Sequence, residues 1–355
     1  MKTKRLLVLE DGSVYEGIAI GSNNYRCGEL VFNTSVAGYQ EVFTDLSSAG
    51  QMVVMTYPLI GNCGINRDDY ESIRPSIFGL IIKDECEKPN NYRCQETLED
   101  FLVREGIAGI ADVDTRAIVM KIKTAGTMKA TFADVDANVD EVVASLKQAK
   151  MENLVSTVAS DKSFSIPGEG KRVVIIDFGI KLSILREMSR QGFDLIVLPY
   201  NVDAKTVMSF IPDAVFLSNG PGNPNELESS VETIRELLAQ KPIFGVGLGC
   251  ELIALASGAK VSKMKVGHHG NHPVLNKTTG KVVITNQNHD YDIDRSSLVN
   301  ADLDIIFEAL NDETIEGIKH QRYNAFGVQF YPETNAECTM YKIFKEMLEK
   351  GKENA

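Results

Sequence analysis

The stretch PIFGVGLGCE, residues 242–251, decides the fold of the second half of the chain. An apolar run of strand character ends at Val246, and a helical pattern begins near Leu248. Glycines at positions 245, 247 and 249 surround the junction, as in the Gly-x-nucleophile-x-Gly turn called a nucleophile elbow. The central residue of such a turn is Ser or Cys, but here it is Gly247, which has no side-chain atom for covalent chemistry. The stretch therefore predicts an elbow without its nucleophile, or a plain tight strand-to-helix turn.

Strands and helices alternate on both sides of this turn. Nearly continuous apolar strands separated by helices indicate a doubly wound parallel sheet, so we predict an α/β fold for this half. The expected strands are 172–177, 195–199, 214–218 and 243–246, and the expected helices are 183–191, 226–239 and 248–257.

The first half of the chain has a different pattern. Short strands broken by turn signals come first, and helical patterns follow, which predicts a mixed α+β domain over residues 1–150. The expected strands are 6–10, 14–17, 29–33, 52–57 and 79–83, and the expected helices are 96–104, 115–124 and 139–148. Asp114 and Gly126 have the residue types expected at the two ends of the second helix. Residues 160–171 collect Ser, Pro and Gly, so we predict a linker over 151–171 before a second domain at 172–355.

Composition excludes several classes of protein. The chain has 355 residues, of which 43% are apolar, enough for two globular cores. We found no apolar stretch near the roughly 20 residues of a membrane span, so we expect a cytoplasmic protein with no membrane partner. The net charge of −12 disfavours a nucleic-acid partner. The six cysteines form no C-x-x-C pair, so reduced thiols are expected.

Two other ligand classes fit the sequence less well. For a dinucleotide fingerprint the third glycine of the turn comes one residue too early. Four of the five histidines, His268, His269, His272 and His289, lie close together in a loop-like region, but no cysteine or carboxylate completes a recognised zinc spacing. We therefore expect no metal site, and assign these histidines to hydrogen bonds that hold loops.

Several long motifs resemble one family along nearly the whole chain, the glutamine-hydrolysing small subunit of carbamoyl phosphate synthetase. In the first half the motifs are LVLEDG at 7–12, VFNTS at 31–35, GYQE at 38–41, TYPLIGN at 56–62 and IADVDTR at 110–116. In the second half they are DFG at 177–179, FLSNGPG at 216–222, LASGAK at 255–260, GHHGNHP at 267–273 and QNH at 287–289.

The resemblance implies a class I glutamine amidotransferase domain, in which an elbow cysteine and a His-x-Glu pair release ammonia from glutamine. The ammonia then reaches a large subunit through a tunnel, where bicarbonate and two ATP yield carbamoyl phosphate for arginine or pyrimidine synthesis. ATP and Mg belong to the large subunit, so no cofactor is expected in this chain.

The chain departs from the family at its reactive positions. Gly247 and Tyr331 replace the cysteine and the histidine, and only Glu333 is kept. The resemblance places the glutamine-binding positions at Ser47, Gly220, Gly222, Leu248, Glu251, Asn288, Asp290 and Tyr291. Glu251 and Asp290 are new carboxylates, and each, if ionised, would cost about 4 kcal/mol against the glutamine carboxylate at an effective dielectric of about 20. Glutamine is therefore a doubtful ligand.

These departures predict a protein that docks on and stabilises a large subunit, in a complex that uses free ammonia. One alternative is a glutaminase of altered mechanism, with Cys250 or a water activated by Glu333. Cys250 is three residues past the elbow, several ångström along the helix axis, which counts against it. Another alternative is a free-standing binder of a small molecule, cationic in view of Glu251 and Asp290.

Overall fold

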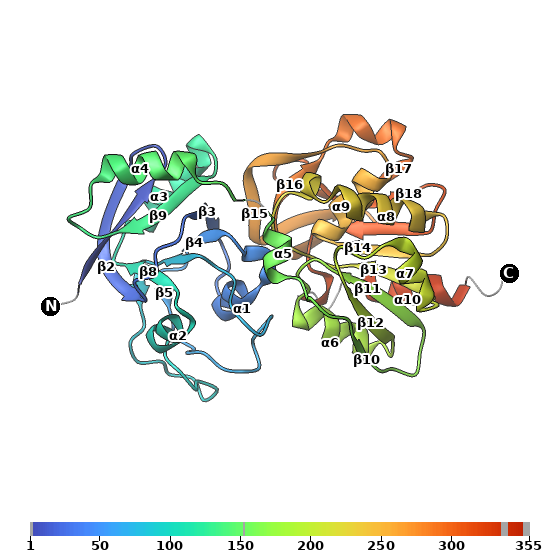
Figure 1. The fold of residues 1–355 in the computed structure, drawn as a ribbon, viewed down its shortest axis with the longest axis horizontal. Coiled ribbons are helices and arrows are strands. Elements are labelled where there is room, and N and C mark those ends of the chain that lie inside the picture. Colours follow the sequence, from blue (N-terminus) through green and yellow to red (C-terminus); the bar gives the residue numbers. More distant parts are fainter. Residues whose placement is uncertain (1–2, 152, 335–339, 351–355) are drawn as a thin grey trace. The chain divides into compact units, whose positions relative to one another are not determined.

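The computed structural model describes residues 3–151, 153–334 and 340–350. The chain forms two compact units, coloured blue to green and green to red in Figure 1. The first comprises Met1–Leu154 with Lys265–His269, and the second comprises Val155–Met264 and Gly270–Ala355. The break at Leu154 falls inside the segment 151–171 that the sequence predicts as a linker.

A closed barrel forms the centre of the first unit, with strand order β1-β2-β8-β6-β4-β3-β9. The strands β3, β4, β6 and β8 pair in parallel, and the remaining pairs are antiparallel. Closure leaves no free strand edge in this sheet. The bounds are β1 Lys4–Leu9, β2 Val14–Gly21, β3 Gly28–Asn33, β4 Gln51–Met55, β6 Gly79–Ile81, β8 Ala108–Ala111 and β9 Met128–Ala133, and a separate parallel pair is formed by β5 Leu59–Ile60 and β7 Asp84–Glu85.

Helices accompany this barrel, which confirms a mixed domain. They are α1 Tyr39–Thr44, η1 Leu46–Ser48, α2 Leu98–Glu105, α3 Thr115–Ala125 and α4 Val139–Gln148. The predicted ends of α3 are confirmed, because the Asp114 side chain accepts a hydrogen bond from the Ala117 N–H and the Gly126 N–H donates to the Ile122 carbonyl. The sequence did not predict β8 and β9, which complete the barrel.

A ten-stranded sheet forms the second unit, in the order β10-β12-β11-β13-β14-β19-β18-β17-β15-β16. Strands β12, β11, β13, β14 and β19 are parallel, which confirms the doubly wound sheet. The bounds are β10 Phe164–Ile166, β11 Arg172–Asp177, β12 Asp194–Pro199, β13 Ala214–Leu217, β14 Ile243–Val246, β15 Val261–Asn276, β16 Val282–Ile293, β17 Leu303–Ala309, β18 Ile315–His320 and β19 Ala325–Val328.

Beyond β19 the sheet is antiparallel, in a part of the chain for which the sequence predicted no strands. Strand β18 pairs antiparallel with β19 and with β17, and β17 pairs antiparallel with β15. Antiparallel neighbours need no crossover helix, so this half of the sheet lacks the strand–helix alternation used as the signal. Strand β10 also pairs antiparallel, with β12, and it lies within the predicted linker.

Helices cover both faces of this sheet. One face packs against α7, α8 and α9, and the other against α6 and α10, because alternate residues of β11 point to opposite cores. The bounds are α5 Leu154–Val158, α6 Leu182–Arg190, α7 Ala204–Ser209, η2 Pro224–Glu226, α8 Glu228–Leu238, α9 Leu248–Ala256, η3 Arg295–Asn300, η4 Pro332–Thr334 and α10 Met340–Lys350. Among the described residues of the chain, no helix is both long and apolar enough to cross a bilayer.

Candidate functional site: an elbow without a nucleophile

The turn between β14 and α9 has the backbone of a nucleophile elbow. Gly247 has φ 55° and ψ −118°, outside the ordinary regions for residues with a side chain. Its N–H donates to the Val328 carbonyl over 2.8 Å, which ties the turn to the end of β19. The predicted elbow is therefore present, at the carboxyl end of the parallel strands.

The two flanking glycines are required by close packing. A Cβ on Gly245 would lie 2.4 Å from the Gly249 carbonyl oxygen, and one on Gly249 would lie 2.3 Å from the Leu217 carbonyl oxygen. Both distances are far below van der Waals contact with backbone atoms that cannot move away. The glycines at 245 and 249 thus let β14, α9 and β13 approach one another.

Gly247 is different, because its missing side chain would have room. The nearest atom to a Cβ built there is the Asn219 Cβ at 3.6 Å, an ordinary contact. The only cost of a side chain is the positive φ, of the order of 1–3 kcal/mol. The turn has therefore lost its reactive atom while keeping the space for it.

The Asn-Gly-Pro-Gly loop after β13 lies beside the elbow. The Asn219 side chain accepts a hydrogen bond from the Lys181 backbone N–H at 3.2 Å. A Cβ on Gly220 would lie 2.3 Å from the Phe178 carbonyl oxygen, so that position tolerates only glycine, and Gly222 has a φ of 89°. The structure thus places the predicted positions Gly220 and Gly222 in the loop that borders Gly247.

A buried lysine, Lys181, contacts the residues at the other two triad positions, Tyr331 and Glu333. The Lys181 Nζ lies 3.3 Å from Glu333 Oε1 and 3.9 Å from the centre of the Tyr331 ring. The side chains of Lys181 and Glu333 are only 5% and 3% exposed. Glu333 also accepts hydrogen bonds from the Ser183 hydroxyl at 3.2 Å and the Tyr341 hydroxyl at 3.4 Å. Glu333, which would orient a histidine in an active triad, here neutralises a buried ammonium group.

The turn after β11 positions this lysine. The Asp177 side chain accepts hydrogen bonds from the N–H groups of Gly179 and Ile180, which fold the chain back before α6 begins at Leu182. Lys181 is the N-cap residue of that helix. Sequence reasoning missed Lys181, although it closely follows the DFG motif, because its partner is 152 residues away.

Glu251 on α9 is buried rather than facing solvent. The residue is 3% exposed, and burial raises the pKa of its carboxyl to about 8, with smaller upward contributions from Asp290 and Asp292. A hydrogen bond from Gln329 Nε2, at 3.3 Å, lowers the pKa in part. Burial therefore favours the protonated form of Glu251 at pH 7, and the repulsion expected from an ionised Glu251 depends on a charge that its surroundings disfavour.

Gln329 and the end of β16 connect the elbow helix to the predicted pocket. Gln329 Nε2 also lies 3.3 Å from the Tyr291 carbonyl oxygen, which the His289 Nδ1 approaches at 2.9 Å. The His289 Nε2 lies 3.1 Å from Gln287 Oε1. Both partners lie two positions from His289 on β16 itself, so these contacts fix the ring within its own strand, and the predicted role of the histidines in holding loops stays a prediction.

The comparisons with known proteins match both halves of the chain. A family model described as carbamoyl-phosphate synthase small chain, CPSase domain, matches residues 7–132, and one described as glutamine amidotransferase class-I matches residues 174–350. The carbamoyl phosphate synthase pyrimidine-specific small chain of Bacillus subtilis is 48% identical, over 94% of this chain and 91% of its own length. This chain belongs to the carbamoyl phosphate synthase small chain family.

Two further small chains match nearly the whole chain, and one solved structure is a more distant match. The carbamoyl phosphate synthase small chain of Fusobacterium nucleatum is 47% identical over 94% of this chain and 93% of its own length, and that of Oceanobacillus iheyensis is 48% identical over 94% and 91%. A solved structure of a glutamine amidotransferase from Thermotoga maritima covers 51% of this chain and 85% of its own, at 20% identity and a TM-score of 0.37.

Cys250 lies next to the elbow of this family member, and it is part of the core. The residue is 0% exposed, and burial raises the pKa of its thiol well above the ordinary value. A Cβ on Gly327 would lie 2.9 Å from its Sγ, so the sulfur packs against β19. A neutral, enclosed thiol is a poor nucleophile, which argues against the alternative that Cys250 replaces the elbow cysteine.

The remaining positions predicted from the family are found on ordered elements. Leu248 is the buried first residue of α9, and Asn288 and Asp290 are partly buried on β16. Ser47 belongs to the first unit, where it is 5% exposed on η1 and its N–H bonds to the Asp45 side chain. The roles of these residues in binding glutamine stay predictions.

Proposed function

We propose that this chain is the small subunit of a carbamoyl phosphate synthase whose own glutaminase site is inactive. In this proposal it docks on and stabilises a large subunit, and free ammonia supplies the nitrogen. The large subunit contributes the ATP and Mg sites, and the complex is cytoplasmic. The naming of its relatives as small chains supports the partnership, and the pyrimidine-specific name of the Bacillus subtilis relative supports a role in pyrimidine synthesis, with arginine synthesis as the other possibility.

The inference that glutaminase activity is lost rests mainly on Gly247. At Gly247 the elbow backbone and the space for a side chain are kept, but there is no atom to attack the glutamine amide carbon. Hydrolysis by the family's route begins with a thioester, and glycine cannot form one.

The surroundings of the elbow support the same conclusion. Tyr331 stands where the general base is expected, and a phenol is a poor base at pH 7. Glu333 is engaged by the Lys181 ammonium and by two hydroxyl groups. This argues against the alternative in which Glu333 activates a water, because three donors already bind a carboxylate that has about four acceptor sites.

The experiment is a comparison of nitrogen donors. The chain is co-purified with a large subunit from the same source, and carbamoyl phosphate formation is measured with ammonium and with glutamine. The proposal expects turnover with ammonium, little or none with glutamine, and a lower melting temperature for the isolated large subunit. Robust glutamine-dependent turnover would show that the site is active, and a failure of the two chains to associate would remove the docking role.

A further inference from the structure

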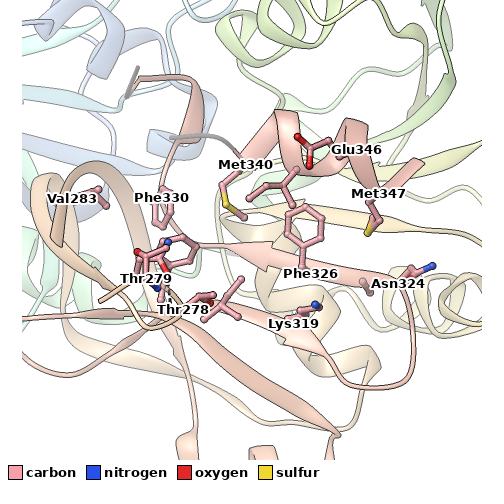
Figure 2. Close-up of a pocket in the computed structure, with 15 residues that line it drawn as sticks. Thr278, Thr279, Val283, Lys319, Asn324, Phe326, Phe330, Met340, Glu346 and Met347 are labelled. Carbon is pink, nitrogen blue, oxygen red and sulfur yellow. Dashed lines mark hydrogen bonds between the residues drawn. The ribbon is translucent and has the colours of Figure 1, made fainter. Parts of the chain in front are cut away.

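A pocket that the proposed function does not use lies in the second unit, between α10 and the antiparallel part of the sheet (Figure 2). Its volume of about 500 Å³ is in the range of small-molecule sites, roughly 300–1,000 Å³. Its lining comes from β15 to β19, from the turn that joins β15 to β16, and from α10.

The floor of the pocket is aromatic and held in place from behind. Phe326 is 5% exposed and stacks on Phe244 with ring centres 4.4 Å apart, and Phe330 is 1% exposed and meets Phe307 edge to face at 5.1 Å. Figure 2 shows the Phe326 ring pointing from β19 toward α10. These rings cannot collapse into the space without breaking their own packing, so the pocket is formed in advance of any ligand.

The wall on α10 is apolar as well, with one acidic exception. Met340, Ile343 and Met347 line the pocket from this helix, together with Glu346. Unbranched methionines adapt to ligands of different shape. The wall therefore favours an apolar body and supplies one negative charge.

The opposite wall supplies one positive charge. Lys319 on β18 is paired in register with Phe326 on β19, so both side chains point to the same face of the sheet. In the ranges that the structure describes, Lys319 has no ion-pair partner. Asn324 lines the pocket in the same region and adds an amide that can donate hydrogen bonds.

We propose that this pocket binds a small amphiphilic anion, with its apolar body on the aromatic floor and a single negative group at Lys319. One lysine faces one glutamate across the pocket, so a second negative charge on the ligand would meet Glu346 without a further cation. A ligand with a single negative group, such as a carboxylate, fits this balance of charge, whereas the several negative charges of a nucleotide do not. This inference does not depend on the nitrogen donor of the complex.

Decanoate, below its micelle-forming concentration, is the probe, with decyltrimethylammonium as the cation of equal chain length. Calorimetry on the purified chain should show saturable binding of decanoate to one site and much weaker binding of the cation. The Lys319→Gln variant should bind decanoate roughly fivefold more weakly, the effect of losing one partly exposed ion pair. The Lys205→Gln variant, which removes an exposed lysine of α7 outside the pocket, should bind like the native chain.

Variants of Ile343 test whether decanoate binds in this pocket, because Ile343 lines it. The residue is 45% exposed, so the fold should tolerate its substitution. Ile343→Trp should fill the mouth and weaken decanoate binding at least tenfold, while Ile343→Ala leaves it open. The chain has no tryptophan, so the emission of the new residue also reports that the variant is folded. Equal decanoate affinity in the two variants, equal affinity for the cation, or no saturable binding would each overturn the proposal.

Discussion

The ammonium group of Lys181 lies 3.3 Å from the carboxylate of Glu333, with both side chains almost fully removed from water. Each charge needs the other, because an isolated buried ion costs several kcal/mol. The presence of Glu333 is thus explained by its ion pair with Lys181, although the sequence resemblance assigns this position to catalysis.

Breaking this pair should destabilise the second unit. Glu333→Gln leaves the Lys181 ammonium buried without its counter-charge, and Lys181→Met does the same to the Glu333 carboxylate. Each variant should lower the free energy of unfolding by about 3–5 kcal/mol. The measurement is urea denaturation followed by circular dichroism. Lys277→Met is the control, because it breaks an ion pair with Glu308 in which the lysine side chain is 41% exposed. This variant should lower the free energy of unfolding by no more than about 1 kcal/mol. Equal losses in the two cases would contradict a structural role for the buried pair.

A cysteine at the elbow should fit but should not restore glutamine hydrolysis. Gly247→Cys meets no atom closer than 3.6 Å at its Cβ, so the variant should fold with a loss of about 1–3 kcal/mol from the positive φ. It still lacks a base, because Tyr331 remains in place. Ammonia release from glutamine is measured for this variant and for Gly247→Cys combined with Tyr331→His. Recovery of activity by the single change would mean that the base is not needed or comes from elsewhere.

The buried carboxyl of Glu251 should make stability fall as the pH rises. Its pKa is about 8 in the folded chain against an ordinary value of 4.5, so the folded state holds a proton that the unfolded state releases. The stability associated with this proton is fully present below about pH 4.5 and is lost as the pH rises through about 8. Glu251→Gln keeps the shape and removes the titration.

The check is the difference in unfolding free energy between the native chain and Glu251→Gln from about pH 5 to 9. The unfolding free energy of the variant, relative to that of the native chain, should increase with pH by up to several kcal/mol. This increase should level off above about pH 8.5. A difference that does not vary with pH would show that Glu251 is not protonated in the folded chain.

Thiol reactivity should separate Cys250 from an exposed cysteine. Cys63 is exposed, whereas Cys250 is enclosed and its thiol pKa is raised, so iodoacetamide should label Cys63 first and Cys250 only when the chain unfolds. Peptide mapping by mass spectrometry at increasing urea concentration measures this order. Rapid labelling of Cys250 in the native chain would revive it as a candidate nucleophile.

The sequence predicted the elements around the elbow closely, because local signals suffice there. Strand β14 and the start of α9 lie where the apolar run, the glycines and the helical pattern place them. The barrel of the first unit was not predicted, since closure depends on pairings such as β1 with β9 that no local pattern records. The long strands β15 and β16 were missed because their many Gly, His and Asn residues carry weak strand signals, and β17 and β18 were not predicted either.

The sequence predicted where the candidate site lies, but not the protonation and ion pairing of its buried side chains. The sequence placed Gly247, Gly220 and Tyr331 through motifs, yet it could not show that Glu251 is buried and protonated. It also could not show that Lys181 reaches Glu333. Both facts depend on which side chains are excluded from water, and that is decided by contacts between segments far apart in the chain.

The short strand β10 has a practical consequence for anyone who wishes to study the second unit by itself. It covers β12, whose backbone N–H and carbonyl groups would otherwise form an open border of the sheet. An open border of this kind can recruit strands from other molecules and lead to aggregates. A fragment that starts at Val155 keeps this protective strand, whereas a fragment cut at Arg172 loses it and should precipitate more readily.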